Sequence, residues 1–486
     1  MFPGLIIDEI LYILVVILVC IRIIYDTHAN TKALAYLLFV IFVPIIGIFV
    51  YFSFGVNYRK RKLYKKKLIL DSVLAKKVRE DLYTESKQVF ERGGKLLEDN
   101  KELAVMLMKD TKSPLTMNNT VTLLRNGENK FPEVLRAIKE ARHHVHIEYY
   151  IYEDDDIGKE VEKALIEKAK EGVAVRFIYD DFGSRSIRRH LVPRLKAAGV
   201  KTAPFYRVRI WAFANRINYR NHRKIIVVDG MVGFVGGINV SNRYVNTTTD
   251  EKKIFWRDTH IRIEGPGVQY LQYLFMSDWN FCTDESLPPD EYFFPKLNTL
   301  PVKGNKIVQI AASGPDSDTP TILFSLLQVI YQARNEILIT TPYFIPTESI
   351  LEALLVAALG GVTVKLLVPA VADSKVVNAA ARSYYGELLA AGGEIYLYKK
   401  GFIHAKTLVA DKKIGIVGTA NIDYRSFDLN FEVNAIVYDK EFADELADDF
   451  YNDLKDSEKI DRAAWDNRPA LDQFMEKTAR LVSPLL

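Results

Sequence analysis

The chain has 486 residues, of which 26% are charged and 49% are hydrophobic, and its formal net charge is +4. This length allows two or three domains with their own cores, and the composition is that of a globular protein. The small net charge argues against a nucleic-acid-binding protein. The two cysteines, Cys20 in an apolar run and Cys282 in a polar segment, do not make a disulfide framework.

Two apolar runs lie at the start of the chain. Residues 10–24 are apolar except for Arg22, whose long side chain can extend toward an interface, and residues 33–54 carry no charge. The second run matches the ~20 residues that a bilayer core requires. Acidic Asp8 and Glu9 precede the first run, which disfavours a cleaved signal peptide. Residues 1–56 therefore predict a two-helix transmembrane hairpin, and two core helices of a soluble domain are the weaker alternative.

A basic segment follows the predicted hairpin. Residues 59–67 contain seven lysines and arginines in nine positions. By the positive-inside tendency, the rest of the chain should lie in the cytoplasm, as part of a multi-pass protein of the cell membrane. Residues 57–112 predict juxtamembrane helices with an apolar stripe. Their basic start could also attract anionic headgroups at ~1 kcal/mol per cation, so the segment can determine topology, bind lipid, or do both.

The remaining sequence is an internal repeat. Each half is expected to run strand, helix, strand, helix, strand and then a polar motif, which predicts an α/β fold of two domains with mixed sheets. The domains are predicted at residues 113–300 and 301–486, with the seam near residues 294–306. The repeat shows in three pairs of matching positions: Ala141-Arg142 with Ala333-Arg334, Gly172 with Gly361, and Leu195 with Leu388.

The polar motif has the form His-x-Lys-x4-Asp-x6-Gly, with an Asn 17 residues after the His. Each copy has two β-branched runs separated at the Asp, which predicts a hairpin with its turn there. Period-two spacing is expected to place the His and the Lys on one face of a strand. Two matched copies suggest one symmetric site rather than two. The copies are His222, Lys224, Asp229, Gly236 and Asn239, and His404, Lys406, Asp411, Gly418 and Asn421.

These residue types suit chemistry at phosphorus. A neutral imidazole can attack the phosphorus atom, and a second, protonated imidazole can give its proton to the departing oxygen. Lys224 and Lys406 can hold the non-bridging oxygens as their charge grows, and Asn239 and Asn421 can add amide donors. No metal or other cofactor is expected, because the lysines supply the positive charge and no metal-binding motif is present.

Each imidazole needs an acceptor on its other nitrogen to fix its tautomer. By position in the repeat, the best candidates are Glu432, 28 residues after His404, and Asp258, 36 residues after His222. Asp229 and Asp411 lie at the predicted turns and are expected to tie backbone amides there.

Other polar positions are expected to be structural. Gly236-Gly237 and Gly418 are expected to form bulges that let the Asn approach the His. His143, His144 and His146 alternate along a strand and are expected to be surface and core residues rather than metal ligands.

At these residues the chain resembles the phospholipase D superfamily and, more narrowly, the bacterial cardiolipin synthases. The resemblance runs from the hairpin and basic stretch to the terminal SPLL, and one departure is Gly-Thr in the second motif where the first has Gly-Gly. The matching segments are IEYYIY, NHRKIIVVDG, FVGGIN, WRDTH, SGPD, TTPYFIP, IHAKTLVAD, GTANID and RSFDLNFE.

The resemblance implies two tandem phospholipase D-like domains whose mixed sheets are flanked by helices. It implies a phosphatidyltransferase that acts at an anionic bilayer and makes cardiolipin and glycerol from two phosphatidylglycerol molecules, through a phosphatidyl-histidine. The implied catalytic positions are His222, Lys224, Asp229, His404, Lys406 and Asp411. We expect His222 to be the nucleophile and His404 the acid and base. A phospholipase D-type hydrolase with the same site is the alternative, and the sequence indicates no oligomeric state.

Overall fold

The structure, a computed structural model, describes residues 3–27, 30–52, 86–110, 113–206, 219–246, 253–296, 304–481 and 483. The chain divides into two compact units. The described residues up to 52, together with Tyr219, belong to the first unit, and the other described residues from Ser86 onward belong to the second. The basic segment at residues 59–67 lies outside the described residues.

The described residues of the first unit form three helices: α1 (Pro3–Asp26), α2 (Asn30–Phe42) and α3 (Pro44–Val50). Helices were expected at residues 10–24 and 33–54, but the second is divided at Val43 because Pro44 begins a new helix. Val19, Ile23, Val40 and Tyr51 form a small buried cluster, and most other apolar side chains of these helices are exposed. Among the described residues, no helix combines the length and the apolarity needed to cross a bilayer.

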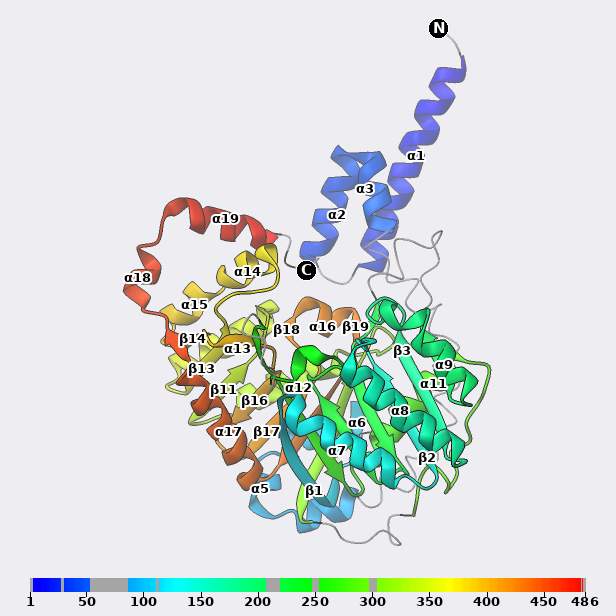
Figure 1. Cartoon of the computed structure of the whole chain (residues 1–486). Coiled ribbons are helices and arrows are strands. Elements are labelled where there is room, and N and C mark those ends of the chain that lie inside the picture. The colour runs from blue at the N-terminus through cyan, green and yellow to red at the C-terminus, as the bar shows by residue number, and fades with distance from the viewer. Residues whose placement is uncertain are drawn as a thin grey trace. The chain divides into compact units, whose positions relative to one another are not determined.

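The second unit is built on one mixed sheet that contains both halves of the repeat (Figure 1). Its strand order is β20-β14-β13-β11-β16-β17-β19-β10-β1-β9-β7-β6-β2-β3-β4. The order is nearly symmetric about the antiparallel pair β1–β10, so the two halves are joined edge to edge. In the first half, the strands are β1 (Thr116–Arg125), β2 (His144–Tyr149), β3 (Ala174–Asp180), β4 (Lys201–Phe205), β6 (Lys224–Val228), β7 (Val232–Gly236) and β9 (Thr259–Glu264). In the second half, they are β10 (Lys306–Ser313), β11 (Glu336–Thr340), β13 (Thr363–Pro369), β14 (Glu394–Tyr398), β16 (Thr407–Ala410), β17 (Ile414–Gly418), β19 (Asn430–Tyr438) and β20 (Ser457–Lys459).

The order of elements within each half confirms the expected repeat. Parallel strands β2, β3 and β4 correspond to β11, β13 and β14, and helices connect them in both halves. The motif hairpins are β6–β7 and β16–β17, with turns at Asp229 and Asp411. Both aspartates adopt a positive φ of 53°, a conformation that Asp tolerates better than most residues.

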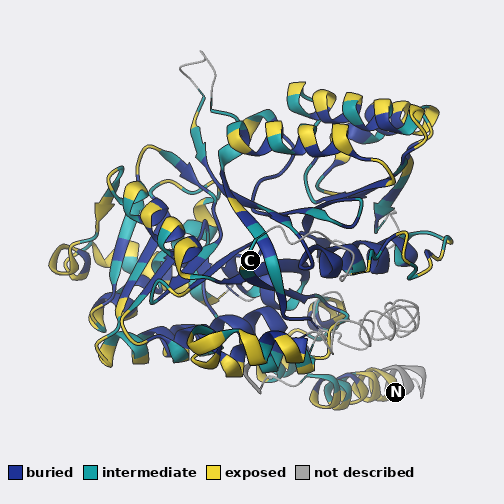
Figure 2. Cartoon of the chain, turned by 90° about the horizontal axis from the view of Figure 1, so that it is seen from below, coloured by how far each residue is buried: buried dark blue, intermediate teal, exposed yellow. Residues whose placement is uncertain are grey.

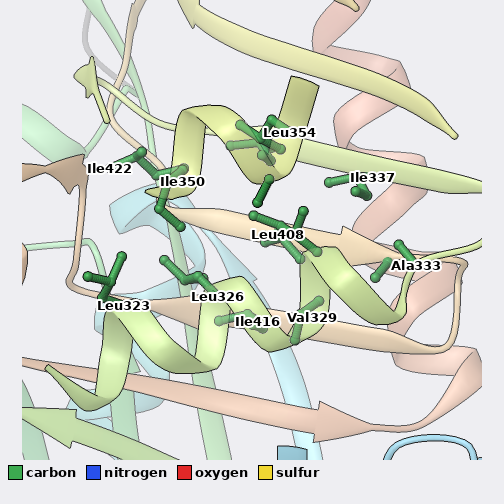
Figure 3. Close-up of a cluster of buried hydrophobic side chains, with 14 of the residues drawn as sticks. Leu323, Leu326, Val329, Ala333, Ile337, Ile350, Leu354, Leu408, Ile416 and Ile422 are labelled. Carbon is green, nitrogen blue, oxygen red and sulfur yellow. The ribbon is translucent and has the colours of Figure 1, made fainter. Parts of the chain in front are cut away.

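Helices cover the sheet, and the strands between them are buried (Figure 2). Over the second half, α12 (Thr321–Gln332) and α13 (Glu348–Leu359) pack Leu326, Val329 and Leu354 onto Ile337, Leu408 and Ile416 (Figure 3). A second cluster contains residues of both halves, such as Ile225 and Ile261 with Val409 and Val433, so the seam between the halves is itself core. The longer helices are α6 (Lys101–Asp110), α7 (Asn126–Glu140), α8 (Asp156–Lys170), α11 (Val268–Cys282), α12 (Thr321–Gln332), α13 (Glu348–Leu359), α14 (Lys375–Arg382), α17 (Lys440–Leu454) and α19 (Ala470–Leu481). Shorter helices are α5 (Gly94–Glu98), α9 (Leu191–Ala197), α15 (Tyr385–Ala390), α16 (Tyr424–Asp428) and α18 (Arg462–Asp466).

Candidate active site

Two short strand pairings join the backbone of one half to the backbone of the other. β5 (Arg220–Asn221) lies parallel to the first residues of β19, which belong to the second half. β15 (Gly401–Ile403) lies parallel to β8 (Phe255–Arg257), which belongs to the first half. Each short strand ends directly before a motif histidine. The repeat therefore brings each histidine to a strand of the opposite half.

This pairing corrects one expectation about the motif. His222 and His404 do not lie within strands β6 and β16, but in the breaks that precede them. The backbone N–H of His222 donates to the carbonyl of Phe431 at 3.0 Å, and that of His404 donates to the carbonyl of Arg257 at 2.7 Å. The histidine backbone is thus held by the opposite half, and that contact ends the regular hairpin pairing.

The residue after each of these carbonyls, Glu432 and Asp258, carries the carboxylate that binds the imidazole. Nδ1 of His222 lies 2.9 Å from both carboxylate oxygens of Glu432. Nδ1 of His404 lies 2.7 Å from Oδ2 of Asp258. Both expected acceptors are therefore at the site, but each serves the histidine of the other half. A carboxylate on Nδ1 places the proton there and leaves Nε2 with the lone pair.

Burial sets the ionisation of the two imidazoles. It lowers the pKa of His222, an effect that Glu432 opposes and Lys224 reinforces. Burial and the neighbouring Lys406 lower the pKa of His404 to about 3, against the opposing effect of Asp258. Burial acts to raise the pKa of Glu432, but His222 and Lys224 bring it below its usual value. Both imidazoles are thus neutral in this environment, and the carboxylate of Glu432 is charged.

The two lysines complete a single electrostatic unit. Nζ of Lys224 donates to the carbonyl of His222 at 2.7 Å, and Nζ of Lys406 donates to the carbonyl of His404. Burial lowers the pKa of Lys224 to about 7, with Lys406 adding to this and Glu432 and Asp258 opposing it. Burial lowers the pKa of Lys406 to about 8, and the carboxylates of Asp258 and Glu432 oppose it. Each ammonium therefore senses charges from both halves, which supports one composite site.

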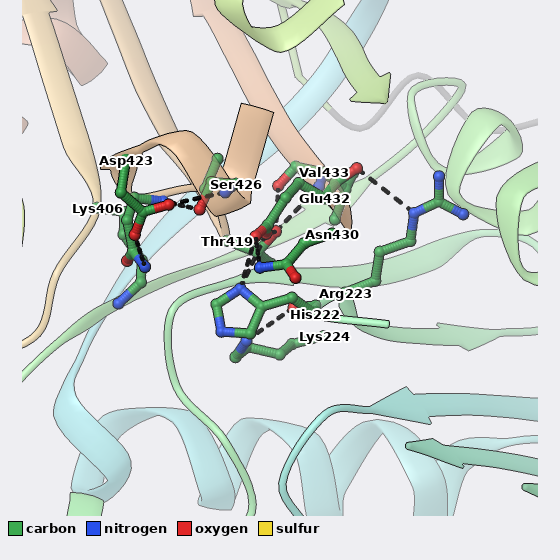
Figure 4. A network of polar contacts seen from close by, with 12 residues as sticks. His222, Arg223, Lys224, Lys406, Thr419, Asp423, Ser426, Asn430, Glu432 and Val433 are labelled. Carbon is green, nitrogen blue, oxygen red and sulfur yellow. Dashed lines mark hydrogen bonds and ion pairs between the residues drawn. The ribbon is translucent and has the colours of Figure 1, made fainter. Parts of the chain in front are cut away.

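The second residue of Gly-Gly in the first motif and of Gly-Thr in the second motif each lies against a carboxylate, Asp258 in the first case and Glu432 in the second. A Cβ on Gly237 would lie 2.1 Å from Oδ1 of Asp258, so only glycine leaves room for this carboxylate. At the same place in the second motif, the hydroxyl of Thr419 donates to Oε2 of Glu432. Figure 4 shows the Glu432 carboxylate between Thr419 and the His222 ring. Thr419, the residue by which the second motif departs from Gly-Gly, therefore directly contacts the carboxylate that orients His222.

Asp229 and Asp411 bind backbone amides at the opposite ends of their strands from the histidines. Asp229 accepts from the N–H groups of residues 142, 143 and 144 at 2.8–2.9 Å. Asp411 accepts from those of residues 334, 335 and 336 at 2.7–2.9 Å. These hydrogen bonds are the backbone ties expected from the turn position. Each fastens the motif hairpin to the start of the neighbouring strand.

The motif asparagines are buried, and each uses part of its amide within the protein. Oδ1 of Asn239 accepts from the N–H of Ile151 at 3.2 Å, and its Nδ2 donates to the hydroxyl of Tyr244 at 2.7 Å. Nδ2 of Asn421 donates to Asp423 at 2.9 Å. Each amide nitrogen retains a second hydrogen, so the expected contact with substrate oxygens stays a prediction.

Aromatic rings that the two polar motifs do not mark border both histidines. Tyr150 lies 4.9 Å from the His222 ring, and Trp256 lies 5.6 Å from the His404 ring, measured between centroids. Tyr150 belongs to the segment IEYYIY and Trp256 to WRDTH, two of the segments that carry the family resemblance. That resemblance is the sequence signal that could have assigned both rings to the site. By contrast, His144 and His146 pack among aromatic rings, and burial lowers the pKa of His144 to about 4. With His143 exposed, these three histidines are the surface and core residues that were expected.

Comparisons with known proteins agree with this geometry. A model for cardiolipin synthase, PLD-like domain matches residues 134–279 and 326–454, and one for a phospholipase D-nuclease N-terminal region matches residues 10–55. The chain is 40% identical to a cardiolipin synthase of Alkalihalophilus pseudofirmus, over 98% of this chain and 93% of the relative. It is 41% identical to the major cardiolipin synthase of Bacillus subtilis, over 98% of both chains. The fold is similar to that of phosphatidylserine synthase from Haemophilus influenzae, with a TM-score of 0.58, 13% identity, and coverage of 79% of this chain and 100% of that one.

Proposed function

The chain belongs to the bacterial cardiolipin synthases of the phospholipase D superfamily, and we propose that it makes cardiolipin through a phosphatidyl-histidine formed at the composite site. It is a phosphatidyltransferase of phospholipid biosynthesis. The observation that carries the proposal is the crossed pairing, in which Glu432 binds His222 and Asp258 binds His404. Two imidazoles with the same tautomer and two lysines then serve one phosphodiester.

The first step transfers a phosphatidyl group to the enzyme. Nε2 of His222 attacks the phosphorus of phosphatidylglycerol, and the bond from phosphorus to the headgroup glycerol oxygen breaks. His404 gives its Nε2 proton to that oxygen, so glycerol leaves as a neutral alcohol. His404 must be protonated for this step, and the negative charge of the entering phosphodiester favours its imidazolium form. Asp258 then stabilises the positive charge on the ring.

The second step resolves the covalent intermediate. The terminal hydroxyl of a second phosphatidylglycerol attacks the phosphorus, His404 takes its proton, and the bond from phosphorus to Nε2 of His222 breaks. The products are cardiolipin and free enzyme. Lys224 and Lys406 hold the non-bridging oxygens in both steps, and the second amide hydrogens of Asn239 and Asn421 can join them.

The enzyme acts at a membrane, and we propose that the N-terminal helices attach it there. Their apolar side chains support this, since Ile10, Leu14, Ile17, Ile45 and Phe49 are all exposed. In this proposal, α1 and α2–α3 form the two arms of a membrane hairpin, and the catalytic unit lies on the cytoplasmic side. The anionic phosphatidylglycerol bilayer is then both the support and the source of substrate.

Product analysis tests the proposed function. Purified full-length protein is incubated with phosphatidylglycerol vesicles, and the products are measured by mass spectrometry. We expect cardiolipin and glycerol in equal amounts, and neither from His222→Ala or His404→Ala at matched protein levels. Phosphatidic acid with glycerol would instead identify a hydrolase that uses water at the same site. Unchanged phosphatidylglycerol would refute both activities.

A further inference from the structure

The C-terminal helix α19 presents its apolar side chains to solvent and its polar side chains to the protein. Leu471, Phe474 and Met475 follow i, i+3 and i+4 spacing, so they share one face, and they are 70%, 65% and 57% exposed. Gln473, Glu476 and Arg480 lie on the other face of the helix. A helix on a soluble protein normally has the reverse arrangement.

The polar face of α19 is fixed by specific contacts. Glu476 is buried and accepts from Nε of Arg382 at 2.8 Å, and from both terminal nitrogens of Arg468 at 2.8 and 3.0 Å. Arg480 donates to Glu387, and Gln473 donates to the carbonyl of Arg468 at 2.9 Å. These contacts determine the rotation of the helix, so the outward apolar face is part of the folded structure.

Helix α14 and the segment before it extend this surface. α14 contacts α19 through the Arg382–Glu476 ion pair, and Figure 1 shows the two helices next to each other. Val371 is 76% exposed and Val376 is 51% exposed. We call Val371, Val376, Leu471, Phe474 and Met475 together the α14–α19 face.

The α14–α19 face lies at the catalytic end of the sheet. Val371 lies two residues after the end of β13. Leu367 of β13 pairs with Thr340, and Thr340 pairs in turn with Thr407. Thr407 is the residue directly after Lys406 of the site. Asp373, between Val371 and Val376, accepts from the hydroxyl of Tyr343 at 2.6 Å and is close enough to act on the charge of Lys406.

We propose that the α14–α19 face docks on the bilayer surface and delivers phosphatidylglycerol to the composite site. The inference rests on the proposed function, because a double-chain lipid must leave its bilayer to reach histidines that are largely buried. Exposed aliphatic and aromatic residues on a fixed amphipathic helix are the features of an interfacial helix. Exposed Lys375 and Lys477 are balanced by exposed Asp373 and Asp472, so the apolar side chains, rather than a net charge, carry the docking.

Insertion of the face can be measured directly. Phe474→Cys is labelled with bimane in full-length protein that also carries Cys20→Ser and Cys282→Ser, and is reconstituted into vesicles with brominated lipids. We expect a blue shift and quenching by lipids brominated near the headgroup. The matched control is Leu359→Cys, which is 74% exposed but lies before the start of β13, at the opposite end of the strand from Val371. Equal signals from the two labels would overturn the proposal.

A kinetic comparison separates docking from chemistry. The double variant Leu471→Asp/Phe474→Asp is assayed on phosphatidylglycerol vesicles and on monomeric dihexanoyl phosphatidylglycerol. We expect about a tenfold or greater loss on vesicles, since burial of each side chain favours the docked orientation of the membrane-attached enzyme by roughly that factor. The rate on the monomeric lipid should stay within about twofold.

The other possible outcomes of these assays also test the docking proposal. Equal losses on both substrates would show that the face acts on the fold or the chemistry, and no loss on vesicles would show that it does not dock. A dimer in detergent that the double variant dissociates would make a second copy the occupant. If the wild-type protein makes no cardiolipin from either lipid, the proposed function is refuted. The bimane measurement does not depend on activity, so it still tests whether the face docks on the bilayer.

Discussion

The crossed histidine–carboxylate pairing predicts a specific effect of the substitution Glu432→Gln. The substitution keeps the shape of the side chain but replaces a buried carboxylate whose oxygens lie 2.9 Å from Nδ1 of His222. A glutamine amide can donate to Nδ1, which places the imidazole proton on Nε2 and blocks the attacking nitrogen. Loss of one hydrogen bond to a charged group removes about 1.5–3 kcal/mol, or roughly 10–100-fold in rate. The wrong tautomer adds to this, up to the ~10⁴-fold that the equivalent change causes in a serine protease triad.

The assay for Glu432→Gln has two readouts. Cardiolipin formation should show a fall in kcat of about 10²–10⁴-fold with a much smaller change in KM. Carbethoxylation mapped by mass spectrometry should change at His222, in the other half, and not at His404. Glu441→Gln, at a side chain 88% exposed, is the control for the chemical change itself. Activity within threefold of wild type, or altered labelling at His404 instead of His222, would refute the crossed arrangement.

Three further predictions concern the same site. Thr419→Ala removes the hydroxyl that binds Glu432 and should lower kcat by about 5–30-fold, whereas Thr419→Ser should restore most of it, as steady-state kinetics will show. Gly237→Ala would place Cβ 2.1 Å from Oδ1 of Asp258 and should abolish cardiolipin formation in the same assay. Its control, Gly386→Ala, should remain active, because its Cβ would come no closer than 3.7 Å to Trp465. Burial lowers the pKa of Lys224 to about 7 and that of Lys406 to about 8, so both ammonium groups are charged at low pH and lose their protons as pH rises through these values. Because His404 must also be protonated, kcat/KM already declines as pH rises toward 7, and loss of the lysine charges should make this decline steeper above pH 7 to 8. A slope that stays unchanged up to pH 9.5 would contradict this.

Much of the fold follows from local sequence patterns. β-branched runs bounded by Asp and Gly predict the hairpins β6–β7 and β16–β17, and these form where expected. The strand–helix alternation of each half is likewise a short-range pattern, and it is present twice. The edge-to-edge joining at β1–β10 was not predicted, because an antiparallel pairing between strands so distant in sequence leaves no periodicity to detect.

The repeat marks the residues of the candidate site, but it does not indicate which of them contact each other. His222, His404, Glu432 and Asp258 are marked by the repeat, whereas the repeat itself suggests pairing within a half. The crossing depends on β5 and β15, strands of two and three residues whose sequences carry no pairing signal. Thr419 was visible as a departure from Gly-Gly, but its contact with Glu432 depends on that same crossing.

The most direct test of the composite site is an experimental structure with vanadate, which mimics the five-coordinate phosphorus of the transition state. We predict one vanadium per chain, with Nε2 of His222 and Nε2 of His404 on opposite sides of it and both lysines on its oxygens. Two vanadates in separate cavities, or one bound to a single histidine with the other ring turned away, would contradict the claim that the halves share one catalytic centre.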